Sequence, residues 1–150
     1  MKAVEIKKTG GPEVLELKDI TLDKPAPDQV TIEQKAIGLN YIDTYHRSGL
    51  YPLDLPIGLG LEGAGFITDI GDNVKDFTVG DKISYAGIPL GSYSTHRNYP
   101  TKNLVKVPDA IDLEVAATLM TKGLTTFYLL HKTFPAKSGQ TILFLSLIHI

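Results

Sequence analysis

Amide and hydroxyl side chains gather in one short stretch of the sequence, between positions 40 and 51. Asn40, Tyr45 and Tyr51 fall within this stretch, and a glycine-rich segment, residues 58–65, follows it closely. Uncharged N–H and O–H groups can stabilise the negative charge that develops on a substrate oxygen when they converge on it. The stretch is therefore a candidate site for a reaction that generates an oxyanion.

Local signals predict that a short helix carries these side chains. Asn40 is a residue type favoured at a helix N-cap, and Asp43 lies where a carboxylate can reach back to the free N–H groups of the first turn. Gly49 suits the left-handed conformation that commonly ends a helix. A helix between these positions places Tyr41 and Tyr45 on one face, because residues four apart are neighbours on a helix surface.

Most of the chain before Pro108 is predicted to form strands separated by turns. Residues 29–37 alternate apolar and polar side chains, the pattern of a strand with one buried face. The 14 glycines and 9 prolines suit many tight turns. The predicted strands span residues 1–6, 14–18, 29–37, 63–70, 83–86, 92–99 and 103–107. Together they predict a mainly β, mostly antiparallel barrel.

The pattern changes after Pro108. Asp112 is suited to cap a helix over residues 113–120, and a second helix is expected over 121–133. Residues 141–144 form an unbroken apolar run, which is typical of a central parallel strand covered on both faces. This part of the chain therefore predicts the beginning of an α/β domain.

Composition and charge exclude several classes of function. Hydrophobic residues make up 43% and charged residues 21% of the chain, which indicates a globular fold. The net charge of −2 offers no basic surface for nucleic acid, and the absence of cysteine excludes disulfides and thiolate metal sites. The longest apolar run, residues 142–150 interrupted by Ser146 and His149, is too short to span a bilayer. We expect a cytoplasmic protein without nucleic-acid or membrane partners.

Three motifs carry a resemblance to a known family. The run Asn-Tyr-Ile-Asp-Thr-Tyr at 40–45, the run Arg-Ser-Gly-Leu-Tyr-Pro at 47–52, and Lys-Gly-Leu-Thr at 122–125 together resemble quinone oxidoreductases of the zeta-crystallin type. These enzymes belong to the medium-chain dehydrogenase/reductase superfamily. The resemblance implies a GroES-like catalytic domain over residues 1–111, followed by the truncated start of a Rossmann nucleotide-binding domain over 112–150.

The end of the sequence departs from the family pattern. The family implies a glycine-rich turn after the strand at 141–144, where backbone N–H groups hold the cofactor pyrophosphate. No glycine follows Gly139. We therefore interpret residues 145–150 as a non-native tail and expect the chain to be inactive on its own.

The resemblance also bears on metal binding. Zinc-dependent members of the superfamily place a cysteine near the position of Asn40 and a histidine in a Gly-His-Glu motif. Here that motif is Gly60-Leu61-Glu62, and neither an asparagine amide nor a leucine replaces a thiolate or imidazole ligand. The four histidines, at 46, 96, 131 and 149, are scattered along the sequence. We expect a site without a metal.

The resemblance implies a role for each candidate residue. The full-length enzyme would transfer a hydride from NADPH to a quinone and would form a homodimer. Tyr45 would contact the cofactor near the nicotinamide, and Thr125 would lie on the nicotinamide side of the cleft. Asn40 and Tyr51 would face the substrate carbonyl. Glu62 is expected to be a buried, paired carboxylate and not a catalytic acid.

Other interpretations remain open on the sequence. Asn40 could serve only as a helix cap, Tyr45 and Tyr51 could serve only in packing, and Thr125 could bond a carbonyl one turn back. A zinc-free reductase of enones, alkenals or acyl thioesters would share the fold and cofactor. A non-enzymatic GroES-like binding module is the third alternative.

Overall fold

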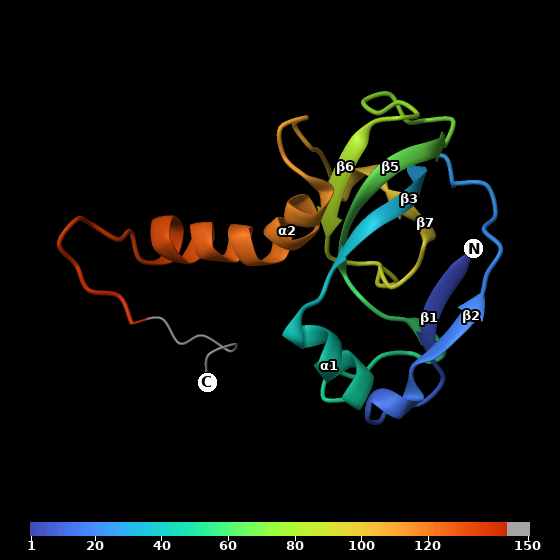
Figure 1. The fold of residues 1–150 in the computed structure, drawn as a ribbon, viewed down its shortest axis with the longest axis horizontal. Coiled ribbons are helices and arrows are strands. Elements are labelled where there is room, and N and C mark those ends of the chain that lie inside the picture. The colour runs from blue at the N-terminus through green and yellow to red at the C-terminus, as the bar shows by residue number, and fades with distance from the viewer. Residues whose placement is uncertain (144–150) are drawn as a thin grey trace.

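The computed structural model describes residues 1–143 and consists of two antiparallel sheets with a long helix beside them (Figure 1). The smaller sheet has the strand order β2–β1–β4 and the larger one β7–β3–β5–β6–β8. The strands are β1 (Lys2–Ile6), β2 (Glu16–Asp19), β3 (Gln29–Gly38), β4 (Ile57–Gly58), β5 (Glu62–Ile70), β6 (Lys82–Ala86), β7 (His96–Pro100) and β8 (Leu104–Lys106). The mainly β prediction for this part of the chain is confirmed.

Helical segments connect and flank the sheets. The helices are α1 (Tyr41–Ser48) and α2 (Leu113–Tyr128), the short 3-10 turns are η1 (Pro12–Val14) and η2 (Thr101–Asn103), and the π-helical segment is η3 (Leu129–Thr133). None of the helices within residues 1–143 combines the length and the apolar character that crossing a membrane requires.

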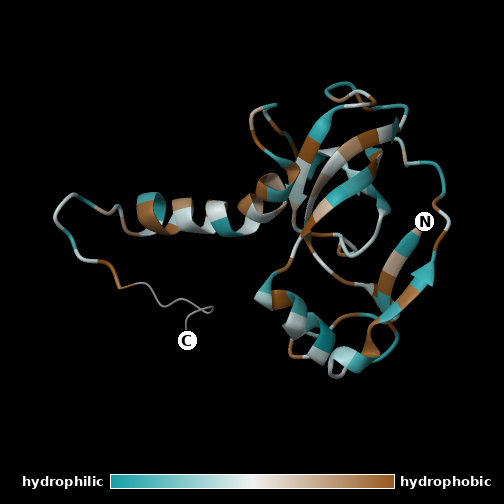
Figure 2. Ribbon diagram, in the orientation of Figure 1, coloured by the Kyte–Doolittle hydropathy of each residue, from teal (hydrophilic) through white to brown (hydrophobic). Residues whose placement is uncertain are grey.

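The larger sheet buries the main hydrophobic core. Apolar and polar residues alternate along its strands, as the colours in Figure 2 show. Val30 pairs with Ile70 of β5 and with Tyr99 of β7, so β3 lies in the interior of the sheet. The fully buried side chains of this core are Val30, Ile32, Ile67, Ile83, Tyr85 and Tyr99. Their burial fixes the register, because a slip of one residue would turn the apolar face of the strand to water.

Backbone contacts join the two sheets. Ala3 forms an isolated bridge with Ser94, and the Val4 N–H donates to the Tyr93 carbonyl at 2.7 Å. The segment before β7 therefore pairs with β1, while its Thr95 carbonyl also accepts the Gln34 N–H of β3 at 2.9 Å. The strand β7 itself begins at His96, whereas the sequence predicted a strand from residue 92.

The part of α2 up to Lys122 packs against the sheets and the start of α1. Ala116 and Ala117 are buried and form a cluster with Ala64 of β5. The Ser84 hydroxyl of β6 donates to the Ala116 carbonyl at 2.8 Å. Gly38 allows this close approach, because a Cβ there would lie 2.9 Å from Glu62 Cδ and closer still to the Ala117 carbonyl oxygen. Beyond this contact α2 extends away from the sheets (Figure 1).

Two predictions for the last part of the chain are wrong. Residues 113–128 form one helix, not two, because no proline or cap interrupts the backbone ladder near position 120 and a single interior glycine costs only about 1 kcal/mol. Residues 141–143 belong to no strand, since none of the other described strands extends beside them. Residue 144 and the interpreted tail at 145–150 lie outside the described residues.

Candidate active site

Helix α1 begins and ends as its sequence predicts. The Asp43 carboxylate accepts a hydrogen bond from the Asn40 backbone N–H at 3.0 Å, and Asn40 itself has an extended backbone before the first turn. Gly49 has a φ of 84° and donates its N–H to the carbonyls of Tyr45 and His46. The helix is fixed by local interactions, which is why the sequence identified it.

The Asn40 side chain joins a buried polar network. Its Nδ2 donates to Glu62 Oε2 at 2.7 Å, and its Oδ1 accepts from the Lys122 ammonium at 2.9 Å. Glu62 is fully buried, and its other carboxylate oxygen accepts from the Thr121 backbone N–H at 2.7 Å. Lys122 Nζ lies 3.7 Å from the same carboxylate.

This network confirms the prediction that Glu62 is buried and paired. A buried carboxylate is costly unless its oxygens are hydrogen-bonded and its charge is paired, and Glu62 meets both conditions. The network also shows that Asn40 does more than begin a helix. Its amide links Glu62 of β5 to Lys122 of α2, and Asn40 itself directly precedes α1.

The two candidate tyrosines lie side by side. The ring centroids of Tyr45 and Tyr51 are 5.3 Å apart with an interplanar angle of 57°, and the Tyr51 backbone N–H donates to the Tyr45 carbonyl at 3.2 Å. Tyr41 packs edge-on against Tyr45 at 5.3 Å. Tyr51 is 48% exposed.

Thr125 lies apart from these side chains. It is exposed on the part of α2 beyond its contact with the sheets, and among the described residues it makes no side-chain hydrogen bond to Asn40, Tyr45 or Tyr51. The back-bond to a carbonyl one turn earlier comes instead from Thr126, which donates to the Lys122 carbonyl at 2.9 Å.

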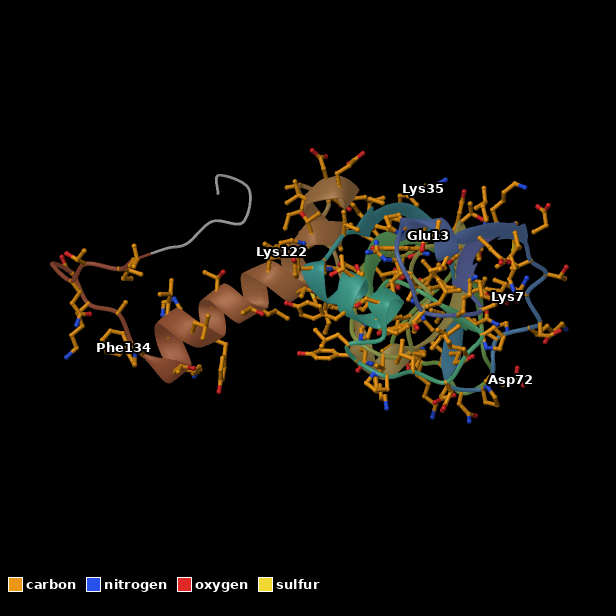
Figure 3. The ribbon with its side chains drawn as sticks, turned by 90° about the horizontal axis from the view of Figure 1, so that it is seen from below. Lys7, Glu13, Lys35, Asp72, Lys122 and Phe134 are labelled. Carbon is orange, nitrogen blue, oxygen red and sulfur yellow. The ribbon has the colours of Figure 1, made fainter. Side chains whose placement is uncertain are left out.

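Lys122 is the site residue that sequence reasoning missed. It lies three positions before Thr125 in the Lys-Gly-Leu-Thr motif, and that motif was the available signal. Figure 3 shows Lys122 where α2 meets the rest of the molecule, with Phe134 at the far end of the helical segment.

An apolar cavity of about 470 Å³ lies beside α1. Its lining residues are Ile42, His46, Leu53, Ile57, Leu61, Gly87, Ile88, Pro89 and Leu90. His46 is the only lining residue with a polar side chain, and its ring centroid lies 6.1 Å from that of Tyr51. His46 is buried, because α1 turns it toward this cavity wall.

A buried arginine holds one wall of the cavity. Arg97 of β7 donates from Nη2 to the carbonyls of Pro89 and Leu90 at 2.7 and 3.0 Å. Its guanidinium carbon lies 4.6 Å from the ring centroid of Tyr99, within the range of a cation–π contact. These contacts tie the loop after β6 to the core of the larger sheet.

A second buried carboxylate supports α1. The Tyr93 hydroxyl donates to Asp43 Oδ2 at 2.7 Å, the same oxygen that accepts the Asn40 backbone N–H. Burial, together with the neighbouring Asp43 carboxylate, raises the pKa of Tyr93 well above the usual value for a phenol. Tyr93 therefore stays protonated and keeps donating to Asp43, which holds α1 against the joint between the sheets.

The side chains at the expected zinc-ligand positions do not fit a zinc ion. The Asn40 amide is engaged by Glu62 and Lys122, and Leu61 contributes an alkyl group to the cavity wall. Within residues 1–143, no three His, Cys, Asp or Glu side chains converge to hold a metal ion. Zinc sites in proteins are built from sulfur, imidazole and carboxylate ligands; of these the network around Asn40 offers the Glu62 carboxylate, whose two oxygens accept hydrogen bonds from Asn40 and Thr121.

Comparison with known proteins identifies related chains. A family model described as the alcohol dehydrogenase GroES-like domain matches residues 26–109. A quinone oxidoreductase from Pseudomonas aeruginosa is 51% identical over 144 residues, which cover 95% of this chain and 44% of the relative. A 2-haloacrylate reductase from a Burkholderia species is 42% identical over 147 residues, with 94% and 44% covered.

A solved structure of a related protein has the same fold as this chain. The Escherichia coli quinone oxidoreductase, crystallised in complex with NADPH, superposes with a TM-score of 0.89 at 46% identity, covering 91% of this chain and 42% of that one. The chain thus spans less than half the length of the relatives it matches.

Proposed function

The chain belongs to the alcohol dehydrogenase GroES-like domain family, and on that premise we propose that it is part of a zinc-free, NADPH-dependent quinone oxidoreductase. One observation carries the proposal. Leu61 stands in the wall of an apolar cavity, at a position where zinc-dependent members of the superfamily place a metal ligand, and the Tyr51 ring lies 6.1 Å from that of His46 in the same wall. The quinone oxidoreductases among the relatives support the same assignment.

The chemistry follows from hydrogen-bond donors and an apolar wall. When bound, NADPH supplies the hydride, and an electrophilic acceptor such as a quinone needs no metal to accept it. The Tyr51 hydroxyl and the Asn40 amide would donate to the oxygen that gains negative charge. Tyr45 and Thr125 would contact the nicotinamide end of the cofactor and hold it against the acceptor.

The residues for the rest of the cofactor are not expected in this chain. A pyrophosphate site needs a glycine-rich turn at a helix N-terminus, and no glycine follows Gly139. We propose that the chain by itself does not catalyse the reaction. The proposed full-length enzyme would be a cytoplasmic homodimer.

The cavity favours a hydrophobic acceptor. Eight of its nine lining residues have apolar side chains or are glycine, so a substituted or fused ring could be buried against them. A carboxylate substrate would gain no partner among these eight. The names of the relatives favour an oxidoreductase over a GroES-like binding module.

A second candidate is reduction of an activated alkene. The relative that is 42% identical is named a 2-haloacrylate reductase, and hydride addition to a conjugated alkene uses the same kind of donor site. Lys122, whose side chain is 54% exposed, would be the cation available to a substrate carboxylate. The same assay distinguishes the two candidates.

The test is a chimeric enzyme in which residues 1–143 replace the matching segment of the E. coli relative. We expect NADPH oxidation with 1,4-benzoquinone at least about tenfold faster in kcat/KM than with an alkenal or 2-chloroacrylate, a difference of about 1.4 kcal/mol. A preference for 2-chloroacrylate would favour the second candidate. Activity lost on treatment with a chelator and restored by zinc would refute the zinc-free site.

A matched pair of variants tests the site. Tyr51→Phe in the chimera is expected to lower kcat about tenfold or more and leave KM for NADPH unchanged, because it removes one donor and keeps the ring. Tyr41→Phe, at an exposed tyrosine of α1, is the control. Unchanged turnover in Tyr51→Phe would remove Tyr51 from the mechanism.

A further inference from the structure

The Asn40 amide is bonded at both of its ends by charged groups. Its nitrogen donates to the Glu62 carboxylate at 2.7 Å, and its oxygen accepts from the Lys122 ammonium at 2.9 Å. An amide that turned over by 180° would place its oxygen against the carboxylate and its NH₂ group against the ammonium. Both contacts would be repulsive, since a carboxylate only accepts hydrogen bonds and an ammonium only donates them. Asn40 therefore has one permitted orientation.

That orientation leaves one hydrogen of the amide free. The NH₂ group carries two hydrogens, and among the described residues it donates only to Glu62. A cation bonded to the amide oxygen draws electron density away from the nitrogen, so the remaining N–H becomes a better donor. The hydrogen bonds that fix the amide thus also prepare it to donate.

We propose that Glu62 and Lys122 are positioning residues, which orient the Asn40 amide so that its free N–H donates to the oxygen of the acceptor. This inference rests on the proposed function for its final step. The orientation itself depends only on contacts within the chain. Neither Glu62, which is fully buried, nor Lys122 needs to touch the substrate.

The two charged residues that bond the Asn40 amide lie on different elements, and one of them is on α2. Glu62 comes from β5, whereas Lys122 and the Thr121 N–H, which also bonds Glu62, come from α2. Lys122 further donates to the Leu39 carbonyl at 3.2 Å, immediately before Asn40. The helix must be seated against the sheets for the amide to be fixed, and Figure 3 shows Lys122 at this junction.

The orientation is tested by NMR on the 150-residue chain. In the wild type, the two Asn40 side-chain N–H signals should differ strongly, with slow hydrogen exchange for the one bonded to Glu62. Lys122→Met should shift the Asn40 signals and speed this exchange about tenfold or more. Lys75→Met, the same substitution at an exposed lysine in the loop between β5 and β6, should leave them unchanged. Asn40 signals in Lys122→Met identical to those of the wild type would overturn the proposal.

Kinetics in the chimeric enzyme test the functional step. Glu62→Gln and Lys122→Met should each lower kcat about tenfold, about 1.4 kcal/mol, with KM for NADPH unchanged. Lys122→Arg keeps a donor to the amide oxygen and should recover most of the activity. A loss that appeared equally in Lys122→Arg and Lys122→Met, or a loss confined to KM, would contradict a positioning role.

The two tests separate the proposals. A chimera that reduces no quinone while the NMR coupling holds would refute the proposed function and leave the orientation of Asn40 established. An active chimera with unchanged kcat in both Lys122→Met and Glu62→Gln would refute only the positioning role. Lys122 is half exposed, so Lys122→Met should fold even if Glu62→Gln does not.

Discussion

The contact between Asp43 and Tyr93 predicts a measurable coupling that holds α1 in place. Asp43 is 4% exposed and accepts two hydrogen bonds on one oxygen, from the Asn40 backbone N–H at 3.0 Å and from the Tyr93 hydroxyl at 2.7 Å. Replacing Asp43 with alanine removes both bonds together. Replacing Tyr93 with phenylalanine removes only the second and keeps the ring.

The magnitude follows from these contacts. Loss of the carboxylate at the start of α1 costs about 1 kcal/mol, and leaving the Tyr93 hydroxyl without an acceptor adds about 1–3 kcal/mol. Asp43→Ala should therefore lower the free energy of unfolding by about 2–4 kcal/mol, and Tyr93→Phe by about 1–2 kcal/mol. The double variant should cost less than the sum, because the shared hydrogen bond can be lost only once. The expected coupling is about 1.5 kcal/mol.

The assay is urea unfolding of the 150-residue chain, followed by tyrosine fluorescence, for the wild type, the two single variants and the double variant. Tyr41→Phe, at a tyrosine that is 60% exposed, is the control and should change the free energy of unfolding by less than about 0.5 kcal/mol. If the two single effects add within about 0.3 kcal/mol, the hydrogen bond between Asp43 and Tyr93 does not stabilise the fold, and this account of α1 is refuted.

Three further predictions concern packing and pH. Gly38→Ala should lower the free energy of unfolding by about 1–3 kcal/mol, because a Cβ would collide with the Glu62 carboxylate and a carbonyl of α2. An unchanged urea midpoint would contradict this. Arg97→Met should lower the free energy of unfolding by about 2–4 kcal/mol, because two loop carbonyls lose their donor. The control Arg97→Lys should lower it less. Equal urea midpoints for the wild type and both variants would show that the fold does not need the buried cation. Burial raises the pKa of Tyr85, Tyr93 and Tyr99, so above pH 10 the unfolded chain loses protons that the folded chain keeps. These tyrosines therefore do not lower the free energy of unfolding below pH 10. Above pH 10 it should fall by up to about 1.4 kcal/mol per pH unit for each of them. Urea midpoints between pH 9 and 11 measure this slope, which Tyr93→Phe should reduce; a flat profile would argue against buried phenols.

Much of the candidate site could be predicted from the sequence because it is local. The caps of α1 lie within three residues of the helix ends, and their conformations depend on near neighbours. Tyr45 and Tyr51 are brought together by the turn at Gly49 that follows the same helix. The resemblance of the 40–52 stretch to quinone oxidoreductases rests on these same local residues.

The errors lie where the outcome depends on partners distant in the sequence. The start of β7 depends on whether residues 92–95 pair with β3 or with β1, and the chain alone gives no measure of that choice. A strand over 141–143 would need neighbouring strands, and apolar composition cannot supply them.

The sequence by itself determined the β-rich fold, the helix that carries the phenols and the family to which the chain belongs, because each is recorded in residues close together along the chain. Only the tertiary structure decided that Glu62 and Lys122, 22 and 82 positions from Asn40, hold the two ends of its amide. It also decided that Leu61 and His46 line one cavity. Such contacts arise when strands and helices return to the same place in space, and the free energy that selects them comes from packing the whole fold.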